Sequence, residues 1–272
     1  MMERTLGDAC RAVLLTAEPR AKVMAARALA RDWRLGRLAH RFDLAMPERP
    51  ARPARPELLA PSQMPKRKKG GSLANRVALL HALAHIEFVA IDLAVDLIGR
   101  FGAGFPRTFV DDWMKVVADE AMHFAVLDRR LTQLGAAYGD LPAHDGLWEA
   151  AEATAHDAAA RLAIVPLVLE ARALDITPQT VARLETAGDP ASARLLRRIG
   201  ADEIAHVAAG VRWFRFTCER DSIEPAERWG RLVRTYFRGS IKAPFNDSAR
   251  SAAGLTPDFY LRVAEQQASP HD

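Results

Sequence analysis

The chain has 272 residues, 49% apolar and 26% charged, and its 38 basic and 34 acidic side chains leave a net charge of +4. This length is too short for several domains, so we expect one sizeable core with appended segments. No stretch approaches the roughly 18 consecutive apolar residues of a membrane span, and charges at Glu3, Arg4 and Asp8 interrupt any signal-peptide core. With two distant cysteines, Cys10 and Cys218, we expect a soluble protein of the reducing cytoplasm.

The first 71 residues are expected to hold two helices and an extended strap. Residues 1–45 are rich in Ala, Arg and Leu at helical spacing, and Pro19 stands where it can open the second helix. Repeated prolines over 46–71 exclude a helix and favour a segment running over a surface. The basic run Lys66–Lys69 could contact nucleic acid, but we favour a solvated loop.

Residues 72–218 are expected to form a bundle of four long helices. The first runs from Leu73 to about Ile98, and the second starts at Thr108, three residues before Asp111 in a capping-box arrangement, and stops at Gly135. The third helix is predicted from Asp145-Gly146 to Leu174, with a kink at Pro166, and Thr177-Pro178 interrupts it. A short extra helix is predicted over 178–187, and the fourth long helix from Asp189-Pro190 to Phe216.

Residues 219–272 are expected to pack on this bundle as a C-terminal helix and tail. The helix is predicted from Pro225 to Phe237. An irregular second strap follows over 237–246, and a short apolar helix is expected around Tyr260.

An internal repeat relates the two halves of the predicted bundle. The hexapeptides Ala118–His123 and Ala201–His206 both read A-D-E-x-x-H, and thirty-three residues before the Glu of each stands a lone Glu in a segment that fits E-x-x-A-[IL]-D-[LI]. A constant offset of 83 residues superposes both elements, which is the signature of an internal repeat. The repeated Glu and His residues are Glu87, Glu120 and His123 in the first copy and Glu170, Glu203 and His206 in the second.

The repeated residues have the chemistry of a dinuclear metal site. On a helix, Glu and His three residues apart share one face and can hold the same ion. If the first two helices form an antiparallel hairpin, Glu87 and Glu120 lie at the same height. Two lone Glu and two Glu-x-x-His motifs are the ligand set of ferritin-like carboxylate centres, in which four carboxylates neutralise two divalent cations. Burying these groups without a cation would be costly. We expect two iron ions, with manganese or a mixed Fe/Mn pair as alternatives.

Four aspartates accompany the predicted ligands. Asp119 and Asp202 each precede a ligand Glu, and we expect them to accept the free N–H of a ligand histidine rather than form surface salt bridges. Asp92 and Asp175 stand five residues after a lone Glu, about 140° around the helix. We therefore expect these two to pair with arginines between helices.

Other candidate residues have more ordinary interpretations. His81 and His85 are spaced for a zinc site, but they do not recur at the 83-residue offset, so a packing or hydrogen-bonding role is favoured. Met122, Phe88 and Phe124 are expected to be core residues, with bordering of a substrate pocket as the alternative.

Taken with these residues, the chain resembles the ferritin-like superfamily. It is more similar to an uncharacterised bacterial family that shares the stretch Leu80–Glu87, both D-E-x-x-H motifs and the tail Lys242–Asn246. A neighbouring group is the di-iron hydroxylase of a thiolated, prenylated adenosine in tRNA. The resemblance implies a ferritin-like four-helix bundle with extra N- and C-terminal helices and Pro-rich straps, and it suggests O₂-dependent hydroxylation by fold analogy.

The leading functional hypothesis is therefore a di-iron hydroxylase or monooxygenase acting on a small molecule or on tRNA. No Cys set is present for a rubredoxin-type iron, so electrons are expected from a separate donor protein. A ferroxidase or iron-handling protein without an organic substrate is the alternative, as is a metal-free helical interaction protein. Sequence does not indicate the oligomeric state.

Overall fold

The computed structural model describes residues 4–65 and 71–268 of the chain, and these residues are helical with two isolated β-bridges. The basic run Lys66–Lys69 lies outside the described residues. The all-α fold class is confirmed, and the arrangement is consistent with a ferritin-like fold. The α-helices are α1 (Leu6–Leu14), α2 (Pro19–Arg34), α3 (Leu73–Phe101), α4 (Arg107–Gln133), α5 (Gly146–Ala153), α6 (Ala158–Ile164), α7 (Ala171–Thr186), α8 (Pro190–Arg220), α9 (Pro225–Tyr236), α10 (Asp247–Ala252) and α11 (Pro257–Ala268).

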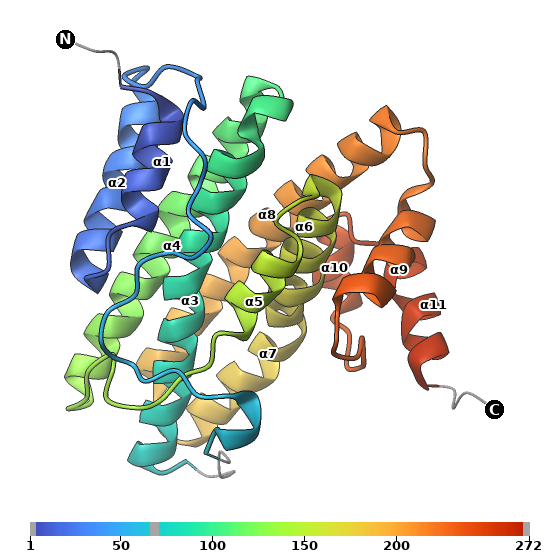
Figure 1. The fold of residues 1–272 in the computed structure, drawn as a ribbon. Helices are drawn as coiled ribbons and strands as arrows, with labels where there is room; N and C mark the ends of the chain where they lie inside the picture. The colour runs from blue at the N-terminus through green and yellow to red at the C-terminus, as the bar shows by residue number, and fades with distance from the viewer. Residues whose placement is uncertain (1–3, 66–70, 269–272) are drawn as a thin grey trace. The chain divides into compact units, whose positions relative to one another are not determined.

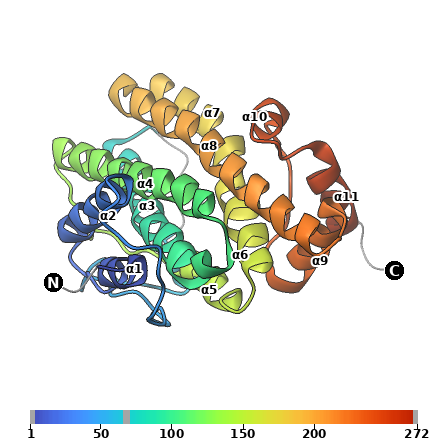
Figure 2. The ribbon, with the colours of Figure 1, turned by 90° about the horizontal axis from the view of Figure 1, so that it is seen from above.

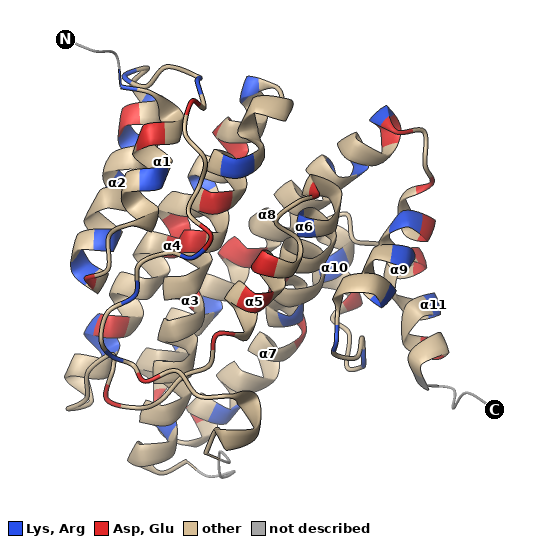
Figure 3. Cartoon of the chain, in the orientation of Figure 1, with Lys and Arg blue, Asp and Glu red and all other residues tan. Residues whose placement is uncertain are grey.

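The described chain divides into two compact units, which are treated separately below. The first comprises Met1–Glu152 and Arg183–Leu195, and the second comprises Ala153–Ala182 and Leu196–Asp272. Acidic and basic residues occur on the helices of both units (Figure 3). Each unit also holds one free, buried cysteine, Cys10 in α1 and Cys218 in α8, and burial raises the pKa of both thiols. The predicted division at residues 71 and 218 stays a prediction.

The first unit is built on the hairpin of α3 and α4. These helices pack along each other, and α1 and α2 pack against them (Figures 1 and 2). Local capping explains where the helices begin, because the Ser72 hydroxyl accepts the Asn75 N–H at 3.3 Å and the Glu18 carboxylate caps α2 immediately before Pro19. Helices α1 and α2 confirm the two helices predicted for the N-terminal segment.

Helix α3 is long and apolar. The most apolar 18-residue window of the segment Leu73–Gly104 has a mean hydropathy of 1.7. By length and composition alone, this segment could cross a membrane. That window is 67% buried inside the protein, and the helix carries the buried carboxylates Glu87, Asp92 and Asp96. We interpret α3 as the core helix of a soluble helical protein.

The Pro-rich segment following α2 runs over the first unit without forming an α-helix, as predicted. Its described part, 46–65, contains a single short 3₁₀ turn, η1 (Pro61–Gln63). Backbone hydrogen bonds fasten it at both ends, with Ala51 N–H donating to Leu14 at 2.8 Å and Leu59 N–H donating to Ala143 at 2.8 Å. We call residues 46–65 the N-terminal strap.

The second unit contains α6 to α11, apart from the short parts of α7 and α8 that belong to the first. Helix α9 packs against α6 and α11, and the Trp229 indole N–H donates to the Ala163 carbonyl at 3.1 Å. The predicted helix from Pro225 is confirmed as α9, whereas α10 was not predicted. Between α9 and α10, residues 237–246 are irregular, as expected for the second strap; we call 237–246 the C-terminal strap.

Three predicted helix boundaries are wrong. Helix α4 begins at Arg107 after Pro106, with no side-chain cap, so Thr108 lies inside the helix and forms no capping box. The predicted helix over 145–174 is broken between α5 and α6, where Asp157 caps a new helix by accepting the Ala159 N–H at 2.8 Å.

Helix α7 also continues through Pro178, where the sequence predicts a break. Proline lacks the N–H that would bond the carbonyl four residues earlier, which is that of Leu174. The Asn246 amide of the C-terminal strap donates to this carbonyl at 3.1 Å. A distant side chain therefore replaces the missing helical bond, and no separate helix forms over 178–187.

Candidate metal centre

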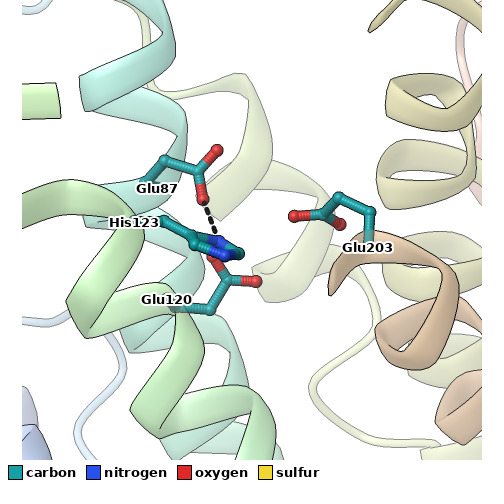
Figure 4. Close-up of side chains that lie close together, drawn as sticks. All are labelled: Glu87, Glu120, His123 and Glu203. Atoms are coloured by element: carbon teal, nitrogen blue, oxygen red, sulfur yellow. Dashed lines mark ion pairs between the residues drawn. The ribbon is translucent and has the colours of Figure 1, made fainter. Parts of the chain in front are cut away.

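The first copy of the repeat forms a compact buried group in the first unit. Glu87 comes from α3, and Glu120 and His123 come from α4, one turn apart. The three residues are at most 6% exposed, and their ligand atoms lie within 4.8 Å of one another. The His123 Nδ1 atom is 3.3 Å from Glu87 Oε2 and 3.6 Å from Glu120 Oε2. The predicted equal height of Glu87 and Glu120 in the hairpin is thus confirmed (Figure 4).

The electrostatics of this group favour positive charge. Burial lowers the pKa of His123, but the adjacent carboxylates of Glu120 and Glu87 outweigh burial and raise the pKa to about 11. Without a metal, the imidazole therefore holds a proton whose charge offsets the carboxylates. Two buried carboxylates and one imidazole supply oxygen and nitrogen donors that suit iron, manganese or zinc. The residues present fit a divalent cation, and the donor set does not select one metal.

The second copy of the repeat has the same local geometry in the second unit. Glu203 and His206 lie one turn apart on α8, and they are 5% and 1% exposed. The His206 Nδ1 atom is 3.6 Å from Glu203 Oε2, the separation found between His123 and Glu120. Both Glu-x-x-His motifs thus place two ligand atoms side by side on a buried helix face, as their spacing predicts. Figure 4 also draws Glu203.

The remaining predicted ligand, Glu170, occupies a backbone irregularity. It is the last residue of a π-helical segment, η3 (Val165–Glu170), and its side chain is half-buried. Pro166 lies at the start of this segment and removes a backbone donor there, so the predicted disturbance before Glu170 is confirmed. Short π-helical segments are frequent at functional sites.

The four accompanying aspartates fall into two groups. Asp92 and Asp175 are both buried. Asp175 pairs with Arg250 of α10, as predicted, whereas Asp92 pairs with Lys22 of α2 and with Arg52 of the N-terminal strap rather than with an arginine of another helix. Asp119 and Asp202 are half-buried. Asp202 accepts a hydrogen bond from the exposed Arg198 Nε at 2.9 Å, which is the surface salt bridge that was not favoured from the sequence. Their proposed bond to a ligand histidine stays a prediction.

The His81 and His85 pair has a hydrogen-bonding role, as favoured from the sequence. His81 Nε2 accepts the Gly139 N–H at 2.9 Å, and His85 Nδ1 lies 3.0 Å from the Tyr138 hydroxyl. Burial, and secondarily Arg52, lowers the pKa of His85 to about 4, so the imidazole is neutral. These histidines fasten the connection between α4 and α5. Tyr138 was missed by sequence reasoning because it lies in that connection and belongs to no motif.

The predicted pocket residues are divided between the core and the surface. Phe88 and Phe124 have ring centroids 5.3 Å apart, and both contact Tyr138. Met122 lines a groove of about 780 Å³ between α2 and α4, together with Met24 and Arg27. None of the six predicted ligands lines this groove. Met122 therefore lines a groove that contains none of the proposed ligands. The buried contacts of Phe88 support a core role for this residue.

Comparison with known proteins identifies relatives without an assigned activity. Residues 15–261 match the model of a family described as "Protein of unknown function (DUF455)". An uncharacterized protein of Haemophilus influenzae (strain ATCC 51907 / DSM 11121 / KW20 / Rd) is 40% identical over 210 residues, which cover 75% of this chain and 73% of the relative. No solved structure matches. The chain belongs to the DUF455 family.

Proposed function

We propose that the two copies of the repeat provide the ligands of one dinuclear carboxylate centre in a ferritin-like protein. In this proposal Glu170, Glu203 and His206 of the second copy act together with Glu87, Glu120 and His123 of the first. The centre would hold two ions, which we propose to be iron.

One observation carries the proposal: both Glu-x-x-His motifs, 83 residues apart, bury their side chains with the same Nδ1–Oε2 separation of 3.6 Å. A surface salt bridge would not require burial in both copies, and isolated buried carboxylates are costly without a balancing charge. Four carboxylates balance the charge of two divalent cations, and the histidines complete a nitrogen and oxygen donor set.

The activity we propose is O₂-dependent hydroxylation of an organic substrate in the cytoplasm. Two reduced iron ions, when bound, would supply the activation of O₂ that attack on a C–H bond requires. The chain contributes the carboxylates that hold the metals and the apolar helix faces that exclude bulk water from them. Both cysteines are buried in separate units, so they provide no additional iron site, and electrons would come from a separate donor protein.

Metal content tests the ligand assignment. Protein reconstituted with Fe(II) without O₂ should bind about two ions per chain. Glu120→Ala and His206→Ala should each lose bound metal, because each removes a donor from one copy of the repeat. The measurement is metal per chain by mass spectrometry, with His156→Ala as the matched control, since His156 is a surface histidine that contacts Tyr236. Full metal content in both ligand variants would refute the assignment.

Exposure of the ferrous protein to O₂ then distinguishes the kinds of activity. A hydroxylase should consume O₂ repeatedly with a reductant and an extract containing its substrate, and it should yield an oxygenated product. Small-molecule extract and purified tRNA are supplied separately, so that the productive one reveals the substrate class. Iron oxidation that proceeds equally without either extract and forms no organic product would instead indicate a ferroxidase.

A further inference from the structure

Each lone-Glu helix carries a buried aspartate that binds an irregular strap. Asp92 lies five residues after Glu87 on α3. Asp175 lies on α7, five residues after Glu170, which ends the π-helical segment η3 that leads into α7. Both aspartate side chains are 0% exposed. Carboxylates are almost never buried so fully unless they are paired, and the two straps supply partners in both cases.

The N-terminal strap is fastened to Asp92. Arg52 of the strap forms an ion pair with one oxygen of Asp92, and Lys22 of α2 forms an ion pair with the other. Lys22 is itself fully buried, and its Nζ also donates to the strap carbonyl of Ala51 at 3.3 Å. One carboxylate of α3 therefore joins this helix to α2 and to the strap at once.

Asp175 has the same role for the C-terminal strap and the start of α10. Arg250 of α10 binds it in a bidentate pair, with Nε and Nη2 at 2.8 and 2.7 Å. The Asn246 N–H donates to Asp175 at 2.9 Å, and the Asn246 amide donates to Leu174. Arg172, on the same helix, donates to the strap carbonyls of residues 242 and 244 at 2.9 and 3.1 Å. The strap thus also satisfies the carbonyl that Pro178 leaves free.

We propose that Asp92 and Asp175 are equivalent positioning residues, through which the two straps fix the helices that carry the lone metal ligands Glu87 and Glu170. This inference rests on the proposed function. A residue five positions further along lies about 7.5 Å up the helix and about 140° around it. Each strap consequently holds its helix on a face away from the ligand and sets the rotation of the helix about its axis.

Buried ion pairs suit positioning better than they suit stabilisation. Their desolvation cost cancels much of the attraction, so replacement by apolar groups is often neutral for stability, whereas the paired geometry can specify one arrangement. The bidentate Arg250 pair is directional, which restrains helix rotation. Loss of these pairs is therefore expected to weaken metal binding by more than the loss of fold stability accounts for.

The test uses Mn(II) alone as the probe, with the full chain. The combined variants Lys22→Met/Arg52→Met/Asp92→Asn and Asp175→Asn/Arg250→Met remove each contact without leaving a fully buried side chain charged and unpaired. The control is Asp221→Asn/Arg228→Met, which removes an aspartate–arginine pair between the end of α8 and α9 that contacts neither strap. Calorimetry gives the Kd, electron paramagnetic resonance distinguishes a coupled ion pair from isolated ions, and chemical unfolding measures stability.

Both strap variants should raise the Kd for Mn(II) by about 10- to 100-fold, as loss of groups that orient ligands does, and should weaken the coupled signal. The control variant should keep a Kd for Mn(II) and a coupled signal close to those of the wild type, even where it loses a similar amount of stability. If one of these combined variants does not fold, Arg52→Lys and Arg250→Lys keep the charge but lose the geometry, and a smaller increase in Kd is expected. Unchanged binding in the strap variants, or equal loss in the control, would overturn this inference alone. A wild-type protein that binds no metal would overturn the proposed function and this inference with it.

Discussion

Asp189 shows how one side chain can organise three helices of the first unit. It caps α8 by accepting the Ser192 N–H at 3.0 Å, and it pairs with Arg130 of α4 at 2.7 Å and Arg76 of α3 at 3.3 Å. Burial raises the pKa of Asp189, but the Ser192 hydrogen bonds and the Arg130 guanidinium outweigh burial and hold the pKa below its ordinary value.

We expect Asp189→Asn to destabilise the protein by about 2 kcal/mol at neutral pH, because charged hydrogen bonds are lost while the cap is retained. A depressed folded-state pKa gives stability that is present above the ordinary carboxyl pKa and is lost as pH falls through the folded value. The difference in the free energy of unfolding between the variant and the wild type should therefore shrink below about pH 4. Urea unfolding of both proteins across this range provides the measurement, and a difference independent of pH would contradict the argument.

At the scale of elements, the π-helical segment before Glu170 packs unusually close to α8. A Cβ added at Gly210 would lie 2.4 Å from Pro166 Cβ and 2.6 Å from Pro166 Cγ, both rigid ring atoms. This contact requires glycine in the middle of a helix, where it otherwise costs stability. The close approach explains why the sequence accepts that cost.

Gly210→Ala should consequently destabilise the protein by about 1–3 kcal/mol, despite the better helix propensity of alanine, because the ring cannot move away. Thermal unfolding should show a lower Tm. Gly104→Ala is the matched control, since nothing lies within 4 Å of its added Cβ, and it should leave the Tm nearly unchanged. An equal or higher Tm for Gly210→Ala would show that α8 and the π-helical segment separate readily.

Local sequence signals predict the elements that local interactions determine. The helices α2, α8 and α9 begin where Pro follows an acidic capping residue, and α4 ends next to Gly135, which has a φ of +77°. The Glu-x-x-His geometry also follows from spacing within one helix. Contacts between residues far apart in sequence were not predictable in the same way, since Asn246 sustains α7 through Pro178 from about 70 residues away.

The proposed ligand residues show the same division. Burial and the Nδ1–Oε2 separations within each motif follow from helix periodicity, and the repeat identifies which residues to compare. Periodicity also indicated that Asp92 and Asp175 do not face the ligands. It could not reveal that each binds a strap, because the straps have no periodic pattern and their positions depend on tertiary packing.

At the scale of the whole molecule, the proposed ligands are distributed over both units: Glu87, Glu120 and His123 belong to the first, and Glu170, Glu203 and His206 to the second. If one centre uses both sets, metal binding stabilises the two units together. Ligand at about 100 times its Kd contributes about 2.7 kcal/mol to the stability of the folded state.

Saturating Mn(II) should therefore raise the Tm of the wild-type protein by about 5–10 °C for a chain of this size. Glu120→Ala and Glu203→Ala should each abolish the rise, because each removes a ligand from a different unit. Differential scanning calorimetry with and without metal provides the comparison. A rise that survives Glu203→Ala would show that the first unit binds metal by itself.

The two buried cysteines give the molecule a native reporter in each unit. A thiol inside a folded helix reacts with a labelling reagent only when its surroundings open. Cys10 lies in the first unit and Cys218 in the second, so their separate labelling rates measure how often each unit opens. Comparing these rates reveals whether the units open independently or as one, without introducing a single foreign side chain.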